Sequence, residues 1–221
     1  MKITILTLFP ELFQNFLNVS IIKNIIKNKI ADIKIVNFRN YSKLKNQQVD
    51  DTPYGGGAGM VLMLQPIVDA IRDNKTKKTK VILLSPQGET FKQTTAKRLS
   101  KEQDLILIAG HYEGFDERIT NYVDEVISIG DYILTGGEIP AMVLVESITR
   151  LLENGISKHS LEVESFDNNL LDFSTYTKPT KFEKYEVPSI LLSGDHKKIN
   201  EYRKKEQLEK TKKLRPDLLK K

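Results

Sequence analysis

A run of four glycines within ten residues is the first feature of the sequence that could serve a ligand. The segment 51–60 reads DTPYGGGAGM. A dinucleotide-binding loop would follow a buried strand and open a helix, and a Walker-type loop would continue with Lys and then Ser or Thr. Here polar residues precede the run, and the apolar residues 60–62 follow Gly59. The segment is therefore not a phosphate-binding loop.

Three further glycine-containing loops each follow an apolar run. They occupy residues 86–88, 111–114 and 131–138. Ligands of open α/β sheets bind beyond the carboxyl ends of the strands, where such loops meet. Glycine there lets backbone amides and carbonyls approach a ligand closely, although a single glycine at a strand end is usually turn chemistry. Together the three loops predict a site that recognises an adenine or a carboxylate through main-chain hydrogen bonds.

The composition excludes several classes of chemistry. The 221 residues include no cysteine, which excludes thiolate catalysis, disulfides and cysteine zinc sites. His111, His159 and His196 show no metal-ligand spacing, so we expect no metal site. No apolar run approaches the roughly 20 residues of a membrane span. The apolar start ends at Pro10 without a small-residue cleavage site, so we expect a core strand rather than a signal peptide, and a cytoplasmic protein.

Short apolar runs alternate with amphipathic stretches along the first 153 residues. The runs are rich in Ile, Leu and Val on both faces and occupy residues 2–8, 32–38, 80–85, 104–110 and 124–130. Such runs are typical of parallel strands covered by helices on each side. Helices are expected between them, at 11–29, after Pro66, at 90–101 and from about Ile139 to Glu153. The alternation predicts an α/β fold with a mostly parallel sheet and helices on both faces.

Basic residues concentrate near the C-terminal end. The net charge is +5, and residues 176–221 alone contain 14 Lys and Arg against 7 Asp and Glu. Before them, residues 154–180 form a polar segment that is longer than a plain connection. A polar helix follows the cap signal Asp195. This pattern predicts a main domain, a linker and a small basic domain whose helix is either solvated or faces nucleic acid.

Long motifs in a fixed order carry a resemblance to a known family. They are DDTPYGGGAGM (50–60), SPQG (85–88), GHYEGFDERI (110–119), SIGDYILTGGEIPAM (128–142), SFDNNLLDFSTYTKP (165–179), VPSILLSGDH (187–196) and KLRPDLL (213–219). In these segments, which cover nearly the whole chain, the sequence resembles the bacterial tRNA (guanine-N1)-methyltransferases. That family belongs to the SPOUT class of methyltransferases, which have a knotted α/β fold.

The resemblance implies an enzyme that methylates the guanosine immediately 3′ of the anticodon, with S-adenosylmethionine as methyl donor. It implies a homodimer and three parts: a domain with a C-terminal trefoil knot (1–153), a linker with the catalytic carboxylate (154–180) and a basic helical tRNA-binding domain (181–221). The residues it assigns to the cofactor are Pro86, Gly110, Tyr112, Gly114, Ile129, Gly130, Asp131, Tyr132, Ile133, Leu134, Gly136, Gly137 and Pro140.

The resemblance also implies roles at the target base. Guanine N1 carries a proton at neutral pH, so the site needs a base near N1 and a donor near O6. The implied catalytic residues are Glu164 as the base and Arg150 as the O6 partner. The implied substrate-binding residues are Gly59, Glu113, Asp172 and Lys178. No metal ligand is implied, and whether Mg²⁺ assists the proton transfer stays open.

Glu164 departs from the family pattern, which has Asp at this place in an EDSF-like motif. The reference pKa values of the two acids differ by only about 0.4, so the risk lies in geometry rather than in basicity. Three outcomes are open: the loop around Glu164 adjusts to the longer side chain, or activity is reduced, or Asp172 takes part in the proton transfer. We favour adjustment of the loop. His111 stands where some members have Arg, and Lys178 where Arg is usual.

Three other hypotheses about function rank behind the tRNA (guanine-N1)-methyltransferase. A non-catalytic tRNA-binding protein would explain the basic tail but would not need three cofactor-type loops. A ribose 2′-O-methyltransferase would share the knot but not the guanine-reading segment 165–179. A Rossmann-type methyltransferase would need a glycine loop after the first strand, which instead runs into Phe9-Pro10.

Overall fold

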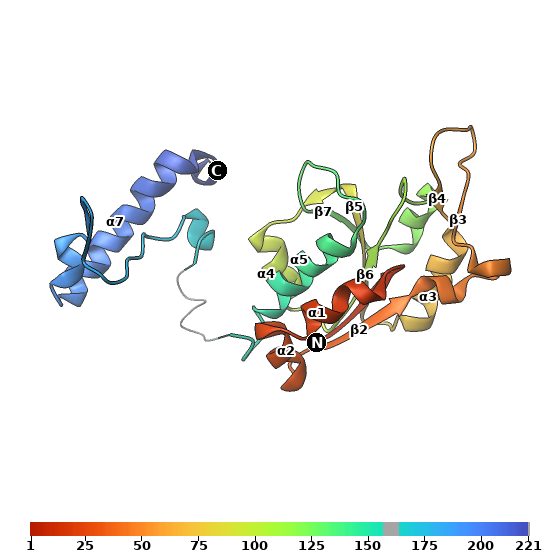
Figure 1. Ribbon diagram of the computed structural model, residues 1–221, viewed down its shortest axis with the longest axis horizontal. Helices are drawn as coiled ribbons and strands as arrows, with labels where there is room; N and C mark the ends of the chain where they lie inside the picture. Colours follow the sequence, from red (N-terminus) through yellow and green to blue (C-terminus); the bar gives the residue numbers. More distant parts are fainter. Residues whose placement is uncertain (157–163, 221) are drawn as a thin grey trace. The chain divides into compact units, whose positions relative to one another are not determined.

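The apolar runs form one five-stranded parallel sheet in the computed structural model, which describes residues 1–156 and 164–220 (Figure 1). The strand order is β2-β1-β6-β5-β7, and every pairing is parallel. The strands are β1 (Lys2–Thr7), β2 (Asp32–Asn37), β5 (Thr79–Thr90), β6 (Asp104–Ala109) and β7 (Glu125–Ser128). The predicted mostly parallel α/β sheet is therefore confirmed.

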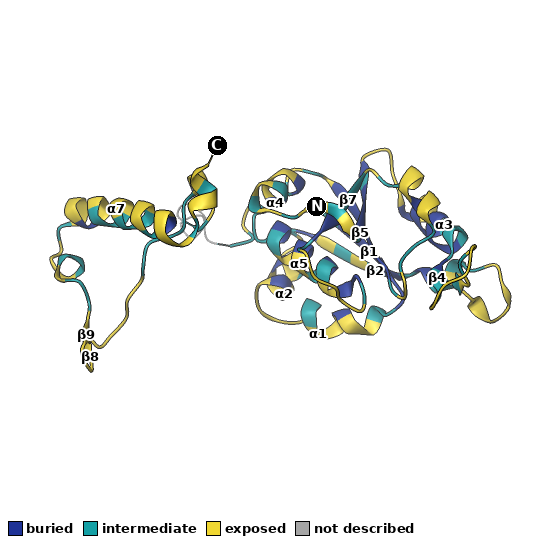
Figure 2. Cartoon of the chain, turned by 90° about the horizontal axis from the view of Figure 1, so that it is seen from above, coloured by how far each residue is buried: buried dark blue, intermediate teal, exposed yellow. Residues whose placement is uncertain are grey.

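Helices cover both faces of this sheet, as predicted. On one face, Ile3, Ile82 and Leu107 pack against α1, α2, α4 and α5. On the other face, Leu6 and Ile106 pack against α3 and neighbouring 3₁₀ turns. The helices are α1 (Phe13–Leu17), α2 (Ser20–Lys27), α3 (Leu64–Asn74), α4 (Gln93–Leu99) and α5 (Glu138–Thr149). Figure 2 shows the buried residues concentrated along the strands and the helix faces that contact them.

The structure divides at residue 156 into two compact units. Unit 1 comprises Met1–Ile156 and unit 2 comprises Ser157–Lys221. The three-part division at 153 and 180 stays a prediction. No helix within the described ranges is long and apolar enough to cross a lipid bilayer.

The expected helix at 11–29 is broken into shorter pieces. A 3₁₀ turn over Pro10–Leu12 precedes α1, and Asn18 and Val19 separate α1 from α2. Ser20, the first residue of α2, has a φ of +49°, a left-handed conformation that the interior of one continuous helix over 11–29 would not allow. The periodic apolar residues still reach the core, because Phe13, Ile22 and Ile25 are buried.

Strand β5 is longer than expected because it contains a bulge. The prediction ended the strand at Ser85, but the strand continues to Thr90. Leu84 and Glu89 both pair with Ile127 of β7, so residues 85–88 leave the ladder and return to it. A Cβ atom on Gly88 would lie 2.4 Å from the backbone nitrogen of Ile127, and only glycine avoids this clash. The SPQG motif is thus a loop set inside a strand.

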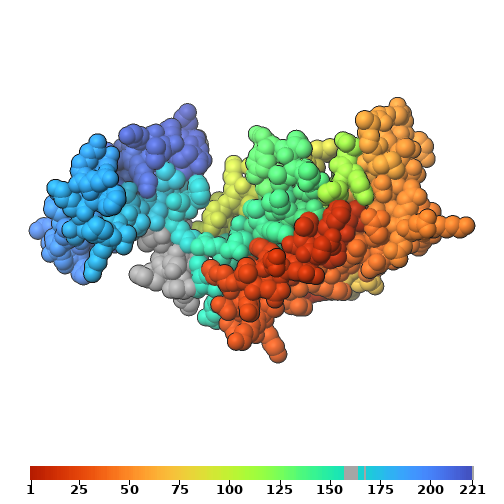
Figure 3. All heavy atoms as spheres, viewed as in Figure 1, coloured from red at the N-terminus to blue at the C-terminus, as the bar shows by residue number. Residues whose placement is uncertain are grey.

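Two short strands that the sequence did not predict frame the glycine run. Strand β3 (Asp50–Asp51) pairs antiparallel with β4 (Val61–Leu62). The segment between them projects from the body of unit 1 (Figure 1, Figure 3). Gly55, Gly56 and Gly57 all have positive φ values, which explains why this exposed turn needs glycine.

Unit 2 is built around α7 (His196–Leu214), whose N-cap is Asp195 as predicted. A short hairpin of β8 (Lys181–Phe182) and β9 (Tyr185–Glu186) accompanies the helix. The segment around Asp172 packs along one side of α7. There the backbone amide of Leu171 donates to Oγ1 of Thr211 at 2.8 Å, and that of Ser174 donates to Glu206 at 3.1 Å. One side of the helix therefore holds this segment and is not solvated.

Edge strand β7 is fastened to α4 and β5 by an ion-pair network. Glu125 accepts two hydrogen bonds from Arg98, at 2.6 and 2.7 Å, and contacts Nζ of Lys80 at 2.7 Å. The hydrogen bonds from Arg98, followed in size by the contact with Lys80, lower the pKa of Glu125. A carboxylate with a lowered pKa stabilises the fold above its unfolded pKa and loses that effect as pH falls through the folded value.

Replacing Glu125 with glutamine is therefore expected to reduce the free energy of unfolding at pH 7 by about 1 kcal/mol, because Arg98 is partly exposed and screened. Below pH 4.5, the ordinary value for glutamate, the difference from wild type should shrink as Glu125 itself becomes protonated. Urea denaturation at pH 7 and at pH 3 measures both quantities. A difference that is independent of pH would contradict the ion-pair explanation.

Candidate functional site

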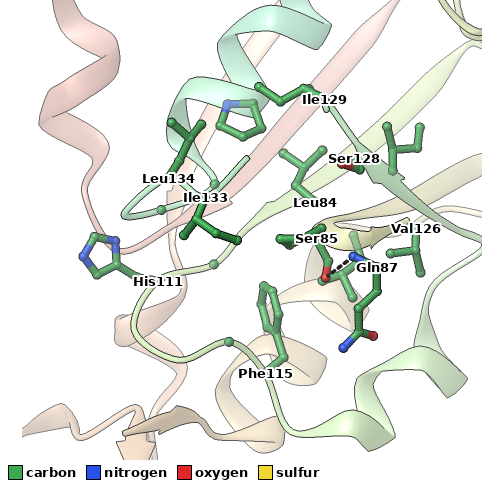
Figure 4. A pocket seen from close by; sticks show the side chains of 18 of the residues that line it. Leu84, Ser85, Gln87, His111, Phe115, Val126, Ser128, Ile129, Ile133 and Leu134 are labelled. Carbon is green, nitrogen blue, oxygen red and sulfur yellow. Dashed lines mark hydrogen bonds between the residues drawn. The ribbon is translucent and has the colours of Figure 1, made fainter. Parts of the chain in front are cut away.

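A cavity of about 400 Å³ lies where β5, β6 and β7 reach their carboxyl-side loops. This volume falls within the range of small-molecule sites, roughly 300–1,000 Å³. Leu84, Phe115, Ile129, Ile133 and Leu134 give it apolar walls (Figure 4). The cavity is therefore suited to a small ligand with a flat or apolar portion.

The three predicted loops meet at this cavity. Its lining includes all the residues expected to bind the cofactor except Asp131, which is exposed beside it. The residues brought together are Pro86, Gly110, Tyr112, Gly114, Ile129, Gly130, Tyr132, Ile133, Leu134, Gly136, Gly137 and Pro140. Their role in cofactor binding stays a prediction.

Two of these glycines allow the start of α5 to touch the end of β6. The amide of Gly137 donates to the carbonyl of Gly110 at 2.7 Å. A Cβ atom on Gly137 would lie 2.7 Å from Cα of Ala109, and one on Gly110 would lie 2.2 Å from Cζ of Phe115. A side chain at either position would therefore push the start of α5 away from the end of β6 or occupy the cavity.

The loop after β7 is held by the Ser128 hydroxyl and by its own backbone. Oγ of Ser128 donates to the carbonyl of Gly130 at 3.1 Å, and the amide of Gly130 donates to the same hydroxyl at 3.2 Å. The amide of Tyr132 also donates to the carbonyl of Gly130, at 3.0 Å. The side chain of Ile133 is 83% exposed, so this loop offers an uncovered apolar residue to a ligand.

The glycine run lies beside the loop after β6. The amide of Glu113 donates to the carbonyl of Met60 at 3.1 Å, and the amide of Leu62 donates to the carbonyl of Gly114 at 2.9 Å. A Cβ atom on Gly59 would lie 2.4 Å from Cγ of Glu113. The structure thus brings together Gly59 and Glu113, which the sequence assigned to the substrate.

The next residues of the same loop carry an ion pair. Asp116 accepts hydrogen bonds from the backbone amide and the guanidinium of Arg118, at 3.0, 2.9 and 2.5 Å. The guanidinium of Arg118 lowers the pKa of Asp116, which stays ionised and caps the 3₁₀ turn over Glu117–Tyr122. Glu117, Ile119 and Thr120 of this turn also line the cavity.

The remaining predicted residues belong to two different units. Arg150 is the C-cap of α5 in unit 1 and is half-buried. Glu164 and Asp172 are half-buried and Lys178 is exposed, all in unit 2. Oδ1 of Asp172 accepts a hydrogen bond from the amide of Phe173 at 2.7 Å. The joint action of Arg150 and Glu164 therefore stays a prediction.

Sequence reasoning missed one buried acid behind the cavity. Glu138 is only 3% exposed and accepts a hydrogen bond from Thr7 at 2.8 Å. In the sequence, an acid at the start of a helix is ordinary cap chemistry, and a threonine inside an apolar strand is ordinary strand composition. The signal that could have found the pair is the burial of both positions on apolar elements.

No group of three or more His, Asp or Glu side chains among the described residues is arranged to hold a metal ion. His159, one of the three histidines of the sequence, lies outside the described residues.

Comparison with known proteins agrees with these motifs. The family model described as tRNA (guanine-1)-methyltransferase TrmD matches residues 1–221. The chain is 62% identical to the tRNA (guanine-N(1)-)-methyltransferase of Malacoplasma penetrans, over 99% of the chain and 96% of the relative. It is 55% identical to that of Ureaplasma urealyticum, over 100% and 97%, and 51% identical to that of Endomicrobium trichonymphae, over the whole of both. The chain therefore belongs to the tRNA (guanine-1)-methyltransferase TrmD family.

Proposed function

We propose that this protein transfers a methyl group from S-adenosylmethionine to N1 of the guanosine immediately 3′ of the anticodon in tRNA. The observation that carries the proposal is the cavity framed by glycine loops in a chain of this family. The relatives are named for the same transfer to guanine N1.

The residues of the cavity fit the proposed cofactor. Ile129, Ile133 and Leu134 offer apolar surface to an adenine, and Gly110, Gly136 and Gly137 line the cavity without side chains of their own. When bound, the sulfonium supplies a methyl group that is already electrophilic, so the protein need not activate it.

The chain's own residues then act on the guanine. We propose that the carboxylate of Glu164 removes the N1 proton, because the N1 lone pair becomes available only as that proton leaves. We propose that the guanidinium of Arg150 donates to O6, where negative charge collects. Glu113 lines the cavity and Gly59 packs against its side chain, and we propose that the two enclose the base. Mg²⁺ assistance is not part of this proposal.

The proposal extends to a trefoil knot in unit 1 and to a homodimer. Support for the dimer comes from α5, an apolar helix that leaves Ile139 56% and Val143 37% exposed. Exposed apolar residues one turn apart on a helix whose other face is buried are typical of a surface that a second protein covers. We propose that a second copy of this chain covers them. The cytoplasmic location stays a prediction.

Unit 2 is proposed to bind tRNA. Residues 176–221 carry seven more basic than acidic residues, and α7 exposes Lys204, Lys205 and Lys212. Binding through these cations would release counterions from the phosphates.

We therefore expect the affinity for tRNA to fall steeply between 50 and 200 mM salt, by about tenfold or more. Removal of residues from Pro188 onward should weaken tRNA binding and leave S-adenosylmethionine binding nearly unchanged, because the cavity lies within unit 1. Filter binding and calorimetry measure the two affinities. An affinity for tRNA that does not vary with salt would contradict this proposal and would indicate that α7 is only a solvated helix.

A single methylation experiment tests the reaction. The protein is incubated with S-adenosylmethionine and a tRNA transcript, and the nucleosides are identified by mass spectrometry after digestion. We expect 1-methylguanosine, and none when the target guanosine is replaced by adenosine. Methyl groups on ribose would instead support a 2′-O-methyltransferase, and cofactor binding without methylation would support a non-catalytic tRNA-binding protein.

A further inference from the structure

A buried carboxylate lies directly behind the loops of the cavity. Glu138 is the first residue of α5 and is 3% exposed. Its Oε1 accepts a hydrogen bond from Oγ1 of Thr7, which is fully buried at the end of β1, at 2.8 Å. The hydroxyl of Thr7 also accepts a hydrogen bond from the amide of Phe9 at 2.9 Å. Glu138 is therefore tied to the chain segment that leaves β1.

The second oxygen of this carboxylate faces His111, which lines the cavity. Nδ1 of His111 lies 3.9 Å from Oε2 of Glu138, is buried, and has no hydrogen-bond partner among the described residues. A Cβ atom on Gly136 would lie 2.3 Å from Oε2 and 2.6 Å from Nδ1. The imidazole packs on the ring of Phe9, with 4.7 Å between ring centroids. Carboxylate and imidazole can thus face each other only because residue 136 is glycine.

These contacts connect three segments that are far apart in the sequence. Thr7 belongs to the end of β1, His111 to the loop after β6, and Gly136 to the loop before α5. Both of these loops line the cavity. A buried carboxylate is costly unless its partners are held in place, so the cluster favours one arrangement of the two loops over others.

We propose that Glu138, held by Thr7, is a positioning residue that preorganises the loops 110–114 and 133–137 for S-adenosylmethionine. This inference rests on the proposed function of the cavity. The carboxylate acts through His111 and Gly136. When loops sample other arrangements, the apparent affinity falls in proportion to the fraction that is competent to bind.

The structure offers a closely matched control at the opposite end of the sheet. Thr79 at the start of β5 is buried, donates to the buried carboxylate of Asp104 at 2.5 Å and accepts a hydrogen bond from the amide of Thr76 at 2.7 Å. Thr7 makes the same pair of contacts beside the cavity. Thr7→Val and Thr79→Val therefore remove equivalent hydroxyls at the two ends of parallel strands.

The test compares these two variants with wild type by calorimetry and by amide hydrogen exchange. Both should lower the melting temperature by a few degrees. Only Thr7→Val should raise the Kd for S-adenosylmethionine, by about tenfold, since hydrogen bonds to charged groups are the stronger ones. Thr7→Ser, which keeps the hydroxyl, should restore the affinity, and Glu138→Gln should weaken it.

Hydrogen exchange gives a readout without any cofactor. The amide of Gly137, bonded to Gly110 at 2.7 Å, should exchange about tenfold faster in Thr7→Val than in Thr79→Val, because the loops it joins lose their common anchor. Equal changes of Kd and of Gly137 exchange in the two valine variants would overturn the inference and leave only a structural role. If wild type fails to bind S-adenosylmethionine, the proposed function fails, and the exchange of Gly137 still decides the positioning role.

Discussion

Glutamine in place of Glu164 is expected to lower the turnover of tRNA methylation by about 10² to 10⁴, the usual contribution of a positioned base. The substitution keeps the shape of the side chain and removes its ability to accept the N1 proton. The affinity for S-adenosylmethionine should barely change, because Glu164 belongs to unit 2 and the cavity to unit 1. Single-turnover methylation and calorimetry measure the two effects separately.

Two companion variants make this expectation specific. Raising the pH should partly rescue Glu164→Gln, since solvent can then remove the N1 proton. Glu164→Asp should stay active, and its rate relative to wild type reports how far the segment has adapted to the longer side chain. Asp172 is the alternative base. If Glu164→Gln methylates at nearly the wild-type rate while Asp172→Asn is inactive, Asp172 removes the proton.

Valine in place of Gly130 is expected to abolish the binding of S-adenosylmethionine. Gly130 has a φ of +149°, a conformation that β-branched residues avoid. A Cβ atom there would also lie 2.5 Å from the ring of Tyr132, so the loop after β7 would have to move away from its present course. Calorimetry should detect no binding, and circular dichroism should show a folded protein.

Gly194→Val is the control that distinguishes the effect of backbone strain from the effect of a new side chain beside the cavity. Gly194 also has a positive φ, +74°, but a Cβ atom there would meet nothing within 4 Å, and the residue lies in unit 2. This variant should lose some stability and keep its affinity for the cofactor. If folded Gly130→Val binds S-adenosylmethionine with unchanged affinity, the loop after β7 is not part of the cofactor site.

Much of the sheet could be predicted because β1 and β6 are buried on both faces. The residues of β6 are all buried, and no amphipathic helix would show such a run. The bulge of β5 could not be predicted, since Pro86 and Gly88 favour a strand end and only pairing with Ile127 extends the strand. Strands β3 and β4 have two residues each, too short for any alternation to show.

The part of the candidate site that depends on glycine could be predicted. Gly110 and Gly137 lie at strand and helix ends, and their closeness follows from the parallel order of the strands. The contact between Thr7 and Glu138 spans 131 residues, and neither residue type is unusual at its own position. Periodicity also cannot reveal a knot, because it describes single elements and not the path between them.

The position of β1 between β2 and β6 has a consequence for how the chain matures during synthesis. β1 pairs with β2 on one side and with β6 on the other, where Lys2 lies opposite Asp104. A ribosome that adds about 5 to 20 residues per second needs roughly 5 to 20 s to produce the segment between them. During that time the apolar strand has an open edge, which is a template for unwanted pairing. The length of this exposure is therefore set by the rate of translation and not by the rate of folding.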